Sequence, residues 1–223
     1  MGPAGTARLD VEAFIRANMP LVPTPSIAGI SLHTARPSSG LWRLLGTGAT
    51  GAHSPYWAYP WAGGAALARH FLDHPEIVRR RRVLDLGAGS GLVAIAAAKA
   101  GAAMVAAVDT DPFAAVAAKV NAAANTVEIS IVRDDLTDGP PPAVDVIAVG
   151  DLFYDQQLAL RVTAFLDRCL TSGIDVLVGD PGRAYLPLSR LRLVAEYEVA
   201  DFGDANATKP GYVFSFIGES AGD

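Results

Sequence analysis

Residues 83–91 read VLDLGAGSG, and this stretch decides the fold. Its apolar start is typical of a short buried strand, and its glycines allow a tight turn and a close approach to a ligand. Ser90 is a candidate N-cap for the helix that should follow. A strand, a glycine-rich turn and a helix in this order predict the first unit of a doubly wound α/β sheet, with free N–H groups at the helix start.

The chain beyond this stretch alternates regularly between strand and helix patterns. We expect strands at residues 83–86, 104–108, 127–132, 144–149, 176–178, 193–201 and 212–217, and helices at residues 90–100, 112–124, 157–170 and 186–191. Such alternation predicts parallel βαβ units. Because no long helix separates the last two strands, they should form a hairpin. The sequence therefore predicts a Rossmann-like, seven-stranded, mostly parallel sheet with one antiparallel strand in a C-terminal hairpin.

Residues 1–60 differ from the rest, being rich in proline, serine, glycine and aromatic residues. A short helix is expected at residues 10–18, a loop at the proline-rich residues 19–25 and a strand at residues 27–33, whereas residues 38–51 should be loosely ordered. A length of 223 residues suggests one domain. We expect residues 1–60 to be an N-terminal extension and residues 61–223 to be the core that carries the site.

Composition argues against several classes of function. The formal net charge is −5, and the only basic cluster, residues 79–82, is expected to solvate a helix end rather than bind nucleic acid. No unbroken apolar run reaches the roughly 18 residues that a membrane span requires. A single cysteine, Cys169, excludes an internal disulfide and fits the cytoplasm. His70 and His74 are a helical turn apart, but Pro75 and the lack of a third ligand argue against a metal site.

The glycine turn also indicates the type of ligand. Asp85 stands two residues before Gly87, and Gly89 follows in the pattern D-x-G-x-G-x-G. A dinucleotide fingerprint would need a glycine at position 92, which is Leu92. A carboxylate does not help to bind an anionic pyrophosphate, but it does help to bind an ammonium group. The pattern therefore favours S-adenosylmethionine, whose methionine end is zwitterionic, over a nicotinamide dinucleotide.

Acidic residues follow the second and third strands of the predicted sheet. Asp109 ends the second strand, 18 residues after Gly91, where a carboxylate can accept hydrogen bonds from both hydroxyls of a ribose. Asp111 should be the N-cap of the next helix. Asp134 and Asp135 follow the third strand. One of them could accept a hydrogen bond from the adenine amino group, or both could be turn residues.

Two further motifs follow the fourth and fifth strands, at the edge of the sheet where ligands bind. Residues 150–155 read GDLFYD, and residues 179–183 read GDPGR. In the first motif Asp151 and Asp155 could hold a cationic methyl acceptor, with Phe153 and Tyr154 as walls. Alternatively, this segment is a plain loop in which Asp155 caps a helix. The second motif taken alone predicts only a turn.

These motifs, together with residues 55–75 (PYWAYPWAGGAALARHFLDHP), resemble the seven-stranded S-adenosylmethionine-dependent methyltransferases. Within that class the chain is similar to the lysine methyltransferases of the electron transfer flavoprotein β-subunit and their bacterial relatives. The resemblance implies a monomeric protein-lysine N-methyltransferase with the β-subunit as its protein partner. It also implies roles for two sets of residues: cofactor contacts at Trp61, Asp85, Gly87, Gly89 and Asp109, and an acceptor loop that includes Asp151, Tyr154 and Asp155.

Other functions remain as alternatives. The tetrad Asn/Asp-Pro-Pro-Tyr of enzymes that methylate planar nitrogens is absent. The chain also resembles ribosomal-protein methyltransferases and nicotinamide methylases, so either a ribosomal protein or a small nicotinamide-like molecule could be the acceptor. A nucleotide-dependent oxidoreductase is disfavoured by the missing glycine at position 92. A non-catalytic module would bind the cofactor but no acceptor.

Overall fold

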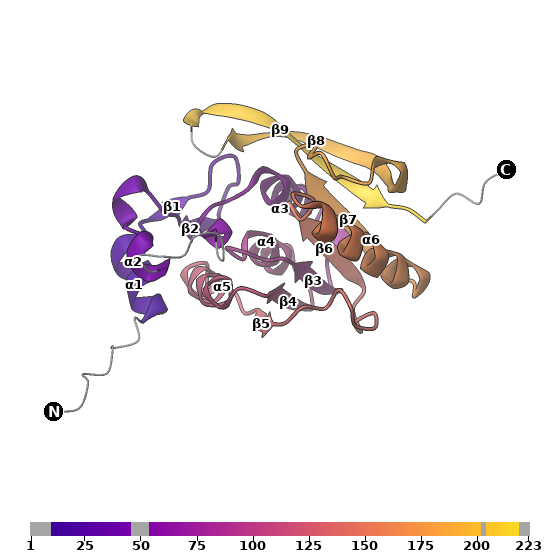
Figure 1. Ribbon diagram of the computed structural model, residues 1–223, viewed down its shortest axis with the longest axis horizontal. Coiled ribbons are helices and arrows are strands. Elements are labelled where there is room, and N and C mark those ends of the chain that lie inside the picture. The colour runs from indigo at the N-terminus through magenta and orange to yellow at the C-terminus, as the bar shows by residue number, and fades with distance from the viewer. Residues whose placement is uncertain (1–9, 46–53, 202–203, 219–223) are drawn as a thin grey trace.

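The main sheet is built outward from β3 (Arg82–Leu86) in the computed structural model, which describes residues 10–45, 54–201 and 204–218. On one side of β3 lie β4 (Met104–Asp109) and β5 (Ser130–Arg133), and on the other lie β6 (Val146–Gly150) and β7 (Asp175–Asp180), all parallel. A hairpin of β8 (Leu191–Asp201) and β9 (Asp204–Phe216) completes the order β5-β4-β3-β6-β7-β9-β8, with β9 antiparallel to both neighbours (Figure 1). This arrangement confirms the predicted seven-stranded sheet.

The central strands are mostly apolar, as expected for strands whose two faces are both covered by helices. Successive side chains of a strand point to opposite faces. Accordingly, Val146 and Ala148 belong to one core, whereas Ile147 and Val149 belong to the other. The first core also contains α3 (Ala62–Asp73) and α4 (Leu92–Lys99), and the second contains α6 (Gln156–Thr171). The sheet is therefore the middle layer of three.

Three helix starts show how the sequence sets the loops at the carboxyl ends of the strands. Asp111 caps α5 (Pro112–Ala124), since its Oδ1 accepts a hydrogen bond from the Phe113 amide at 2.7 Å. Asp155 caps α6 in the same manner. The predicted cap Ser90 is wrong, because Gly91 takes the N-cap position of α4 with φ +81°. A left-handed residue is needed there, and glycine adopts that conformation without strain.

The N-terminal segment packs against α5 rather than forming loose structure. α1 (Val11–Asn18) is followed by β1 (Leu21–Pro23) and β2 (Ser31–His33), which pair as a small antiparallel sheet, so the loop predicted for residues 19–25 is wrong in part. Proline is tolerated at the end of so short a strand. Within the range predicted to be loose, the structure has η1 (Pro37–Ser39) and α2 (Trp42–Leu45), and residues 46–51 lie outside the described residues.

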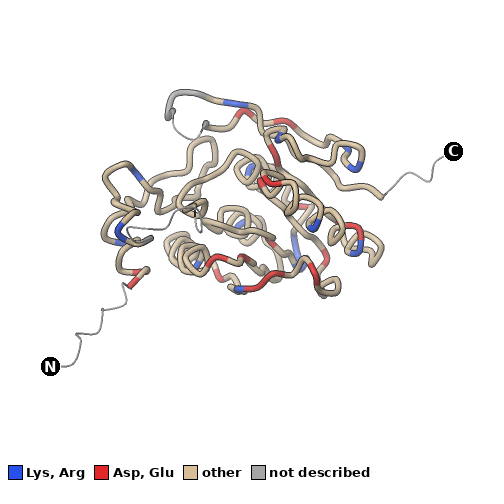
Figure 2. Tube along the Cα trace, in the orientation of Figure 1, with Lys and Arg blue, Asp and Glu red and all other residues tan. Residues whose placement is uncertain are grey.

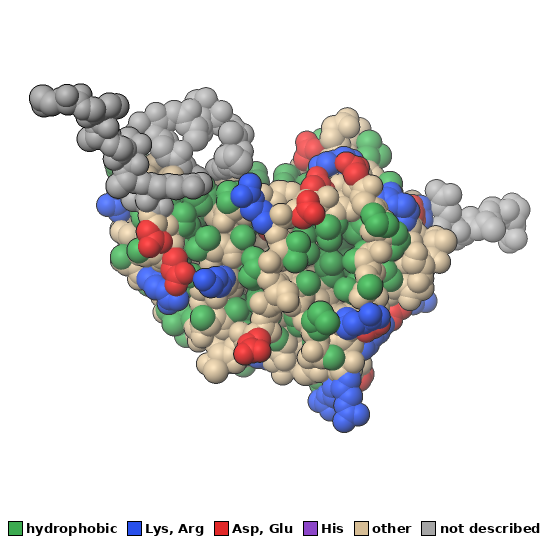
Figure 3. Space-filling view, turned by 90° about the horizontal axis from the view of Figure 1, so that it is seen from below, with side chains coloured by type: hydrophobic (Ala, Val, Ile, Leu, Met, Phe, Trp, Pro, Cys, Tyr) green, Lys and Arg blue, Asp and Glu red, His purple; other side chains and the backbone are tan. Residues whose placement is uncertain are grey.

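Short helical turns complete the chain. They are η2 (Tyr56–Ala58), η3 (Pro75–Ile77) and η4 (Leu188–Arg190), the last lying in the range expected to be a short helix. No helix in the described part of the chain combines the length and apolar character needed to cross a membrane. In Figure 2 acidic positions recur around β4, β5 and the loop after β5. Figure 3 shows one face on which basic side chains are scattered among hydrophobic and acidic ones.

Candidate active site

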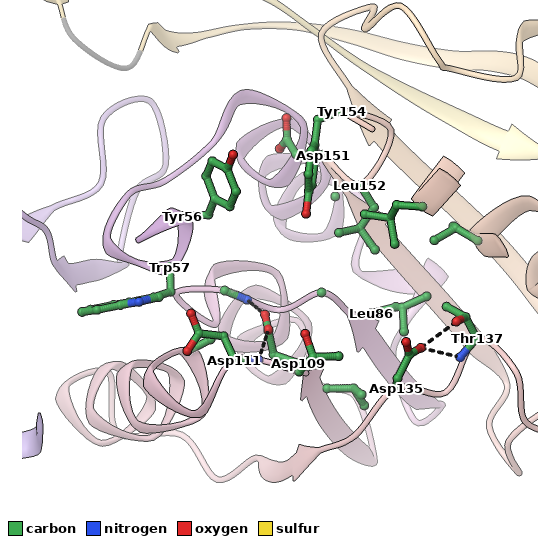
Figure 4. A pocket seen from close by; sticks show the side chains of 18 of the residues that line it. Tyr56, Trp57, Leu86, Asp109, Asp111, Asp135, Thr137, Asp151, Leu152 and Tyr154 are labelled. Atoms are coloured by element: carbon green, nitrogen blue, oxygen red, sulfur yellow. Dashed lines mark hydrogen bonds between the residues drawn. The ribbon is translucent and has the colours of Figure 1, made fainter. Parts of the chain in front are cut away.

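One pocket of about 580 Å³ lies at the carboxyl ends of β3, β4 and β6. Ligand sites of open α/β sheets lie at this edge, and cavities of this size are typical of small-molecule and cofactor sites. Figure 4 shows side chains from the segment before α3, from the ends of the strands and from the loop after β6 that point into the pocket. Its lining residues include nine of the ten predicted site residues, namely Trp61, Gly87, Gly89, Asp109, Asp134, Asp135, Asp151, Tyr154 and Asp155.

The glycine turn lines one end of the pocket, where the sequence predicts that the cofactor binds, and we call this the cofactor end. Gly87 and Gly89 both line the pocket. Asp85 does not, because it lies beneath the turn with only 1% of its surface exposed, and its Oδ2 accepts a hydrogen bond from the Ala94 amide at 3.0 Å. Burial raises the pKa of Asp85 to about 7. The structure thus gives Asp85 a supporting place, and its contact with a ligand stays a prediction.

Asp109 joins two loops at the end of β4. Its Oδ2 accepts a hydrogen bond from the Gly89 amide at 2.8 Å, and its Oδ1 accepts one from the Asp111 amide at 2.9 Å (Figure 4). Burial raises the pKa of Asp109, although the hydrogen bonds from both amides oppose this effect. A carboxylate has about four lone-pair sites. Asp109 therefore retains capacity to accept hydrogen bonds from a ligand in the pocket.

Asp134 and Asp135 lie at the pocket wall after β5 and differ in their partners. Asp135 accepts hydrogen bonds from the Thr137 amide (3.0 Å) and hydroxyl (2.6 Å) with Oδ1, and its Oδ2 pairs with Arg161 at 2.9 Å. The Thr137 hydroxyl and the Arg161 guanidinium hold the pKa of Asp135 below its usual value. Asp134 accepts the Asp135 amide with Oδ1. Asp135 therefore makes more hydrogen bonds and ion pairs than Asp134, whose carboxylate keeps more capacity to bind a ligand.

Asp151 lines the part of the pocket where the sequence predicts the methyl acceptor, which we call the acceptor end, and its backbone conformation is unusual. Its φ of +59° is uncommon for a residue other than glycine and is characteristic of functional positions. The side chain is buried, with Oδ2 accepting a hydrogen bond from the Gly64 amide at 2.8 Å and Oδ1 accepting one from Arg183 Nη2 at 2.6 Å. Burial raises the pKa of Asp151, and the Arg183 guanidinium lowers it.

The contact between Asp151 and α3 depends on an unusually close backbone approach. A Cβ atom built on Gly63 would lie 2.1 Å from the carbonyl oxygen of Gly179, at the end of β7. Only glycine fits such a contact between two backbones. This approach brings the start of α3 over the ends of β6 and β7, where the Gly64 amide reaches Asp151. Residues far apart in the sequence thus form one wall.

Two tyrosines pack against each other at the acceptor end. The rings of Tyr56 and Tyr154 lie 5.3 Å apart by their centroids, and both side chains are about half exposed (Figure 4). Burial raises the pKa of Tyr154. Phe153 instead lies wholly in the core beneath α6, so the expectation that it forms a wall of the acceptor site is wrong. Asp155 both caps α6 and lines the pocket.

Arg183 is the site residue that the sequence did not identify. It lines the pocket, pairs with Asp151 and places its guanidinium carbon 5.9 Å from the ring centroid of Trp61. Trp61 Nε1 in turn donates a hydrogen bond to the Tyr56 carbonyl at 2.7 Å. The available signal was the place of the GDPGR motif at the same sheet edge. Among the described residues, no three His, Cys, Asp or Glu side chains are grouped to hold a metal ion.

Two solved structures with similar folds are methyltransferases. The ribosomal protein L11 methylase of Lactobacillus delbrueckii subsp. bulgaricus superimposes with a TM-score of 0.53 at 24% identity, over 72% of this chain and 81% of that one. The Thermus thermophilus 16S rRNA N2 G1207 methyltransferase, solved with AdoMet and guanosine, gives a TM-score of 0.54 at 20% identity over 89% of this chain and 51% of that one. Both show that the fold is that of Rossmann-like methyltransferases.

Sequence comparisons give a narrower result. The profile of the ribosomal protein L11 methyltransferase (PrmA) family matches residues 67–150. The electron transfer flavoprotein β-subunit lysine methyltransferase of Danio rerio is 41% identical over 178 residues, which are 78% of this chain and 69% of that protein. Its Xenopus laevis counterpart is 37% identical over 209 residues, which are 89% and 83% of the two chains. This chain therefore belongs to the electron transfer flavoprotein β-subunit lysine methyltransferase family and is a methyltransferase.

Proposed function

We propose that this enzyme transfers a methyl group from S-adenosylmethionine to a lysine amine of a folded protein, the electron transfer flavoprotein β-subunit. The substrate is proposed from the names of the relatives, and the reaction is proposed from the residues that line the pocket. One observation carries the proposal: the acid–aromatic loop with Asp151 and Tyr154 lines the same cavity as the glycine turn and Asp109. A cofactor end and an acceptor end therefore lie side by side, as a two-substrate transfer requires.

The residues at the cofactor end fit S-adenosylmethionine. Gly87 and Gly89 leave room for the methionine end, which Asp85 supports from beneath the turn. Asp109 would accept hydrogen bonds from the ribose hydroxyls. Asp134, the less engaged of the two acids after β5, would accept one from the adenine amino group, and Trp61 would close the site. When bound, the cofactor supplies a methyl group that is open to in-line attack by a neutral amine.

The residues of this chain would align that amine and exclude water from around it. A lysine amine has an ordinary pKa of about 10.4 and must lose a proton before it can attack. Tyr56 and Tyr154, whose rings pack together, would form one wall beside the side chain and would exclude water from that side. Asp151 would orient the nitrogen, Asp155 would flank it, and the released proton would pass to water. Such alignment alone can be worth roughly 7 kcal/mol of the barrier.

The test is methylation of the purified β-subunit, with mass spectrometry locating the methyl group. Asp151→Asn should lower turnover and leave cofactor affinity nearly unchanged, because the contact is made with the acceptor. Asp155→Asn is the matched variant, since asparagine also caps helices well, and it separates the contributions of the two acids. Full turnover in Asp151→Asn would remove the role given to this residue.

The same assay decides the substrate. The profile match to L11 methyltransferases makes ribosomal protein L11 the natural competing protein, and nicotinamide represents the small-molecule alternative. We expect incorporation into a lysine of the β-subunit. Labelling of L11 or of nicotinamide without labelling of the β-subunit would show that the proposed substrate is wrong.

A further inference from the structure

Three charged side chains meet behind the acceptor end of the pocket, on the ends of β6 and β7 and the turn after β7. Arg183 lies between two carboxylates: Nη2 is 2.6 Å from Asp151 Oδ1, and Nε is 3.5 Å from Asp180 Oδ2. The Asp180 side chain is fully buried and that of Asp151 is 9% exposed, whereas that of Arg183 is 26% exposed and lines the pocket. Arg183 is therefore the member that faces a ligand.

Arg183 is held in this place by more than one contact. Asp180 Oδ1 accepts hydrogen bonds from the amides of Gly182 and Arg183, at 2.8 and 2.7 Å, which fixes the turn that carries the arginine. The guanidinium also lies over the Trp61 ring. Arg183 Nε and Asp180 Oδ2 are buried without a hydrogen-bond partner among the described residues. A buried charge left incompletely bonded is costly, so core stability is a weak explanation for this cation.

The charges around the acceptor end set the local electrostatics. Two carboxylates and one guanidinium give the cluster a formal charge of −1, and the first turn of α3, which packs against it, contributes no acidic residue. The other titratable side chains lining this part of the pocket are Tyr56, Asp109, Tyr154 and Asp155. Without Arg183 the cluster would carry −2 and would attract any ammonium ion that entered.

We propose that Arg183 shifts the protonation state of the acceptor: its cation at the pocket wall weakens the attraction of the neighbouring carboxylates for a lysine ammonium, so more of the bound acceptor is the neutral, nucleophilic amine. This inference rests on the proposed function, in that the acceptor must be an amine. The guanidinium offsets the attraction of Asp151 and Asp180 for a second cation while leaving Asp151 in place to orient the nitrogen. Arginine suits this role because it stays charged at every working pH.

The first test is the pH dependence of methyl transfer to the β-subunit. Only the neutral amine reacts, so the rate rises with pH until the bound amine is fully deprotonated. Arg183→Gln removes a positive charge from the pocket wall, which should move this rise in rate to a pH about one unit higher. Arg183→Lys keeps the charge and is the matched control. Its rate should rise over the same pH range as that of wild type, even if its turnover is lower.

The second test measures acceptor binding and needs no turnover. Wild-type enzyme saturated with S-adenosylhomocysteine is titrated with β-subunit at pH 8 in buffers of different ionisation enthalpy. Selection of the neutral amine predicts the release of about one proton per acceptor bound, because a free lysine is charged at this pH. Arg183→Gln should release clearly less, and melting curves of both variants show whether each is folded.

These results separate the inference from the function on which it rests. Two results would show that the role given to Arg183 is wrong while the proposed function stands. In the first, wild type methylates a lysine but the rate of Arg183→Gln rises over the same pH range as that of wild type. In the second, wild type binds its acceptor without releasing a proton. If Arg183→Lys shifts as far as Arg183→Gln, geometry rather than charge explains the arginine. If wild type methylates no lysine, both proposals are wrong.

Discussion

The two ends of the pocket are built in different ways. At the cofactor end most contacts join loops that follow neighbouring strands: the Gly89 amide reaches Asp109 across 20 residues, Asp111 bonds within its own turn, and Asp135 bonds both within its turn and to Arg161, 26 residues away. At the acceptor end the Gly64 amide reaches Asp151 across 87 residues. The cofactor end is thus a product of local sequence, whereas the acceptor end exists only once α3 has packed on the sheet.

This difference predicts how each end responds to mutation. A change at the cofactor end should alter cofactor binding and leave the rest of the molecule in place. A change in the contact between α3 and β7 should disturb the acceptor end and the fold together, because the same backbone approach carries both. Variants at Asp85, Gly63, Asp109 and Trp61 test this difference between the two ends, in order of decreasing expected effect.

Asp85 tests whether the base of the cofactor end belongs to the core. Its pKa is about 7 in the folded protein and 3.8 as a free side chain, so the folded state binds the proton more tightly. Its contribution to stability is present in full below about pH 4 and is lost as the pH rises through 7. A shift of about 3 units corresponds to at most about 4 kcal/mol.

Urea unfolding from pH 4 to pH 8 measures this effect. The difference in unfolding free energy between wild type and Asp85→Asn should fall as the pH rises, since asparagine does not titrate. Asp145→Asn is the control of opposite sign, because Arg82 holds the pKa of the partly exposed Asp145 at about 2. Wild-type and Asp85→Asn curves that run parallel would show that Asp85 is not buried as described.

Gly63 tests the acceptor end. Gly63→Ala would place a Cβ 2.1 Å from the Gly179 carbonyl oxygen, and neither backbone can give way cheaply. We expect a loss of about 3 kcal/mol in unfolding free energy, together with loss of methyl transfer. The neighbouring Gly64→Ala is the matched control, because its Cβ would make only ordinary contacts at 3.7 Å or more. Equal effects at the two glycines would contradict the close approach.

Asp109 tests the cofactor end alone. Asp109→Ala removes the predicted ribose contact, and a hydrogen bond to a charged group is worth about 1.5–3 kcal/mol. Calorimetry should show tens-fold weaker binding of S-adenosylmethionine, with a melting temperature close to that of wild type. Asp111→Asn, which keeps the cap of α5, serves as the control. An unchanged affinity in Asp109→Ala would refute the assignment.

Trp61 should give the smallest effect. Tryptophan fluorescence is expected to change when the cofactor is added, and Trp61→Ala should abolish most of that change with only a few-fold loss of affinity. Trp42 is 63% exposed on α2 and provides the control, because Trp42→Phe should keep the signal. A signal that disappears with Trp42 and survives without Trp61 would exclude closure of Trp61 over the cofactor.

The same division explains what could be predicted from the sequence. The glycine turn, the place of Asp109 and the cap Asp111 follow from residues adjacent in the chain, and all three lie as expected. The alternative reading of Asp155 as a helix cap is confirmed as well. Ser90 was misjudged because the backbone after the turn needs a left-handed residue, and Gly91 supplies it.

The acceptor end could be predicted only in part. Asp151 and Tyr154 reach the pocket, but Phe153 between them turns into the core beneath α6. The irregular loop after β6 does not follow the alternation of a strand, so the sequence pattern could not separate its inward from its outward side chains. Arg183 escaped notice because its partner Asp151 is 32 residues away on another strand end.

A crystal structure with S-adenosylhomocysteine and a β-subunit lysine peptide would test most directly the claim that one pocket has a cofactor end and an acceptor end. The account predicts the ribose hydroxyls on Asp109, the amino-acid end over Gly87 and Gly89, and the sulfur facing a lysine nitrogen between Tyr154 and Asp151. An adenosine group bound between Tyr56 and Tyr154, or a lysine nitrogen held elsewhere on the surface, would contradict it.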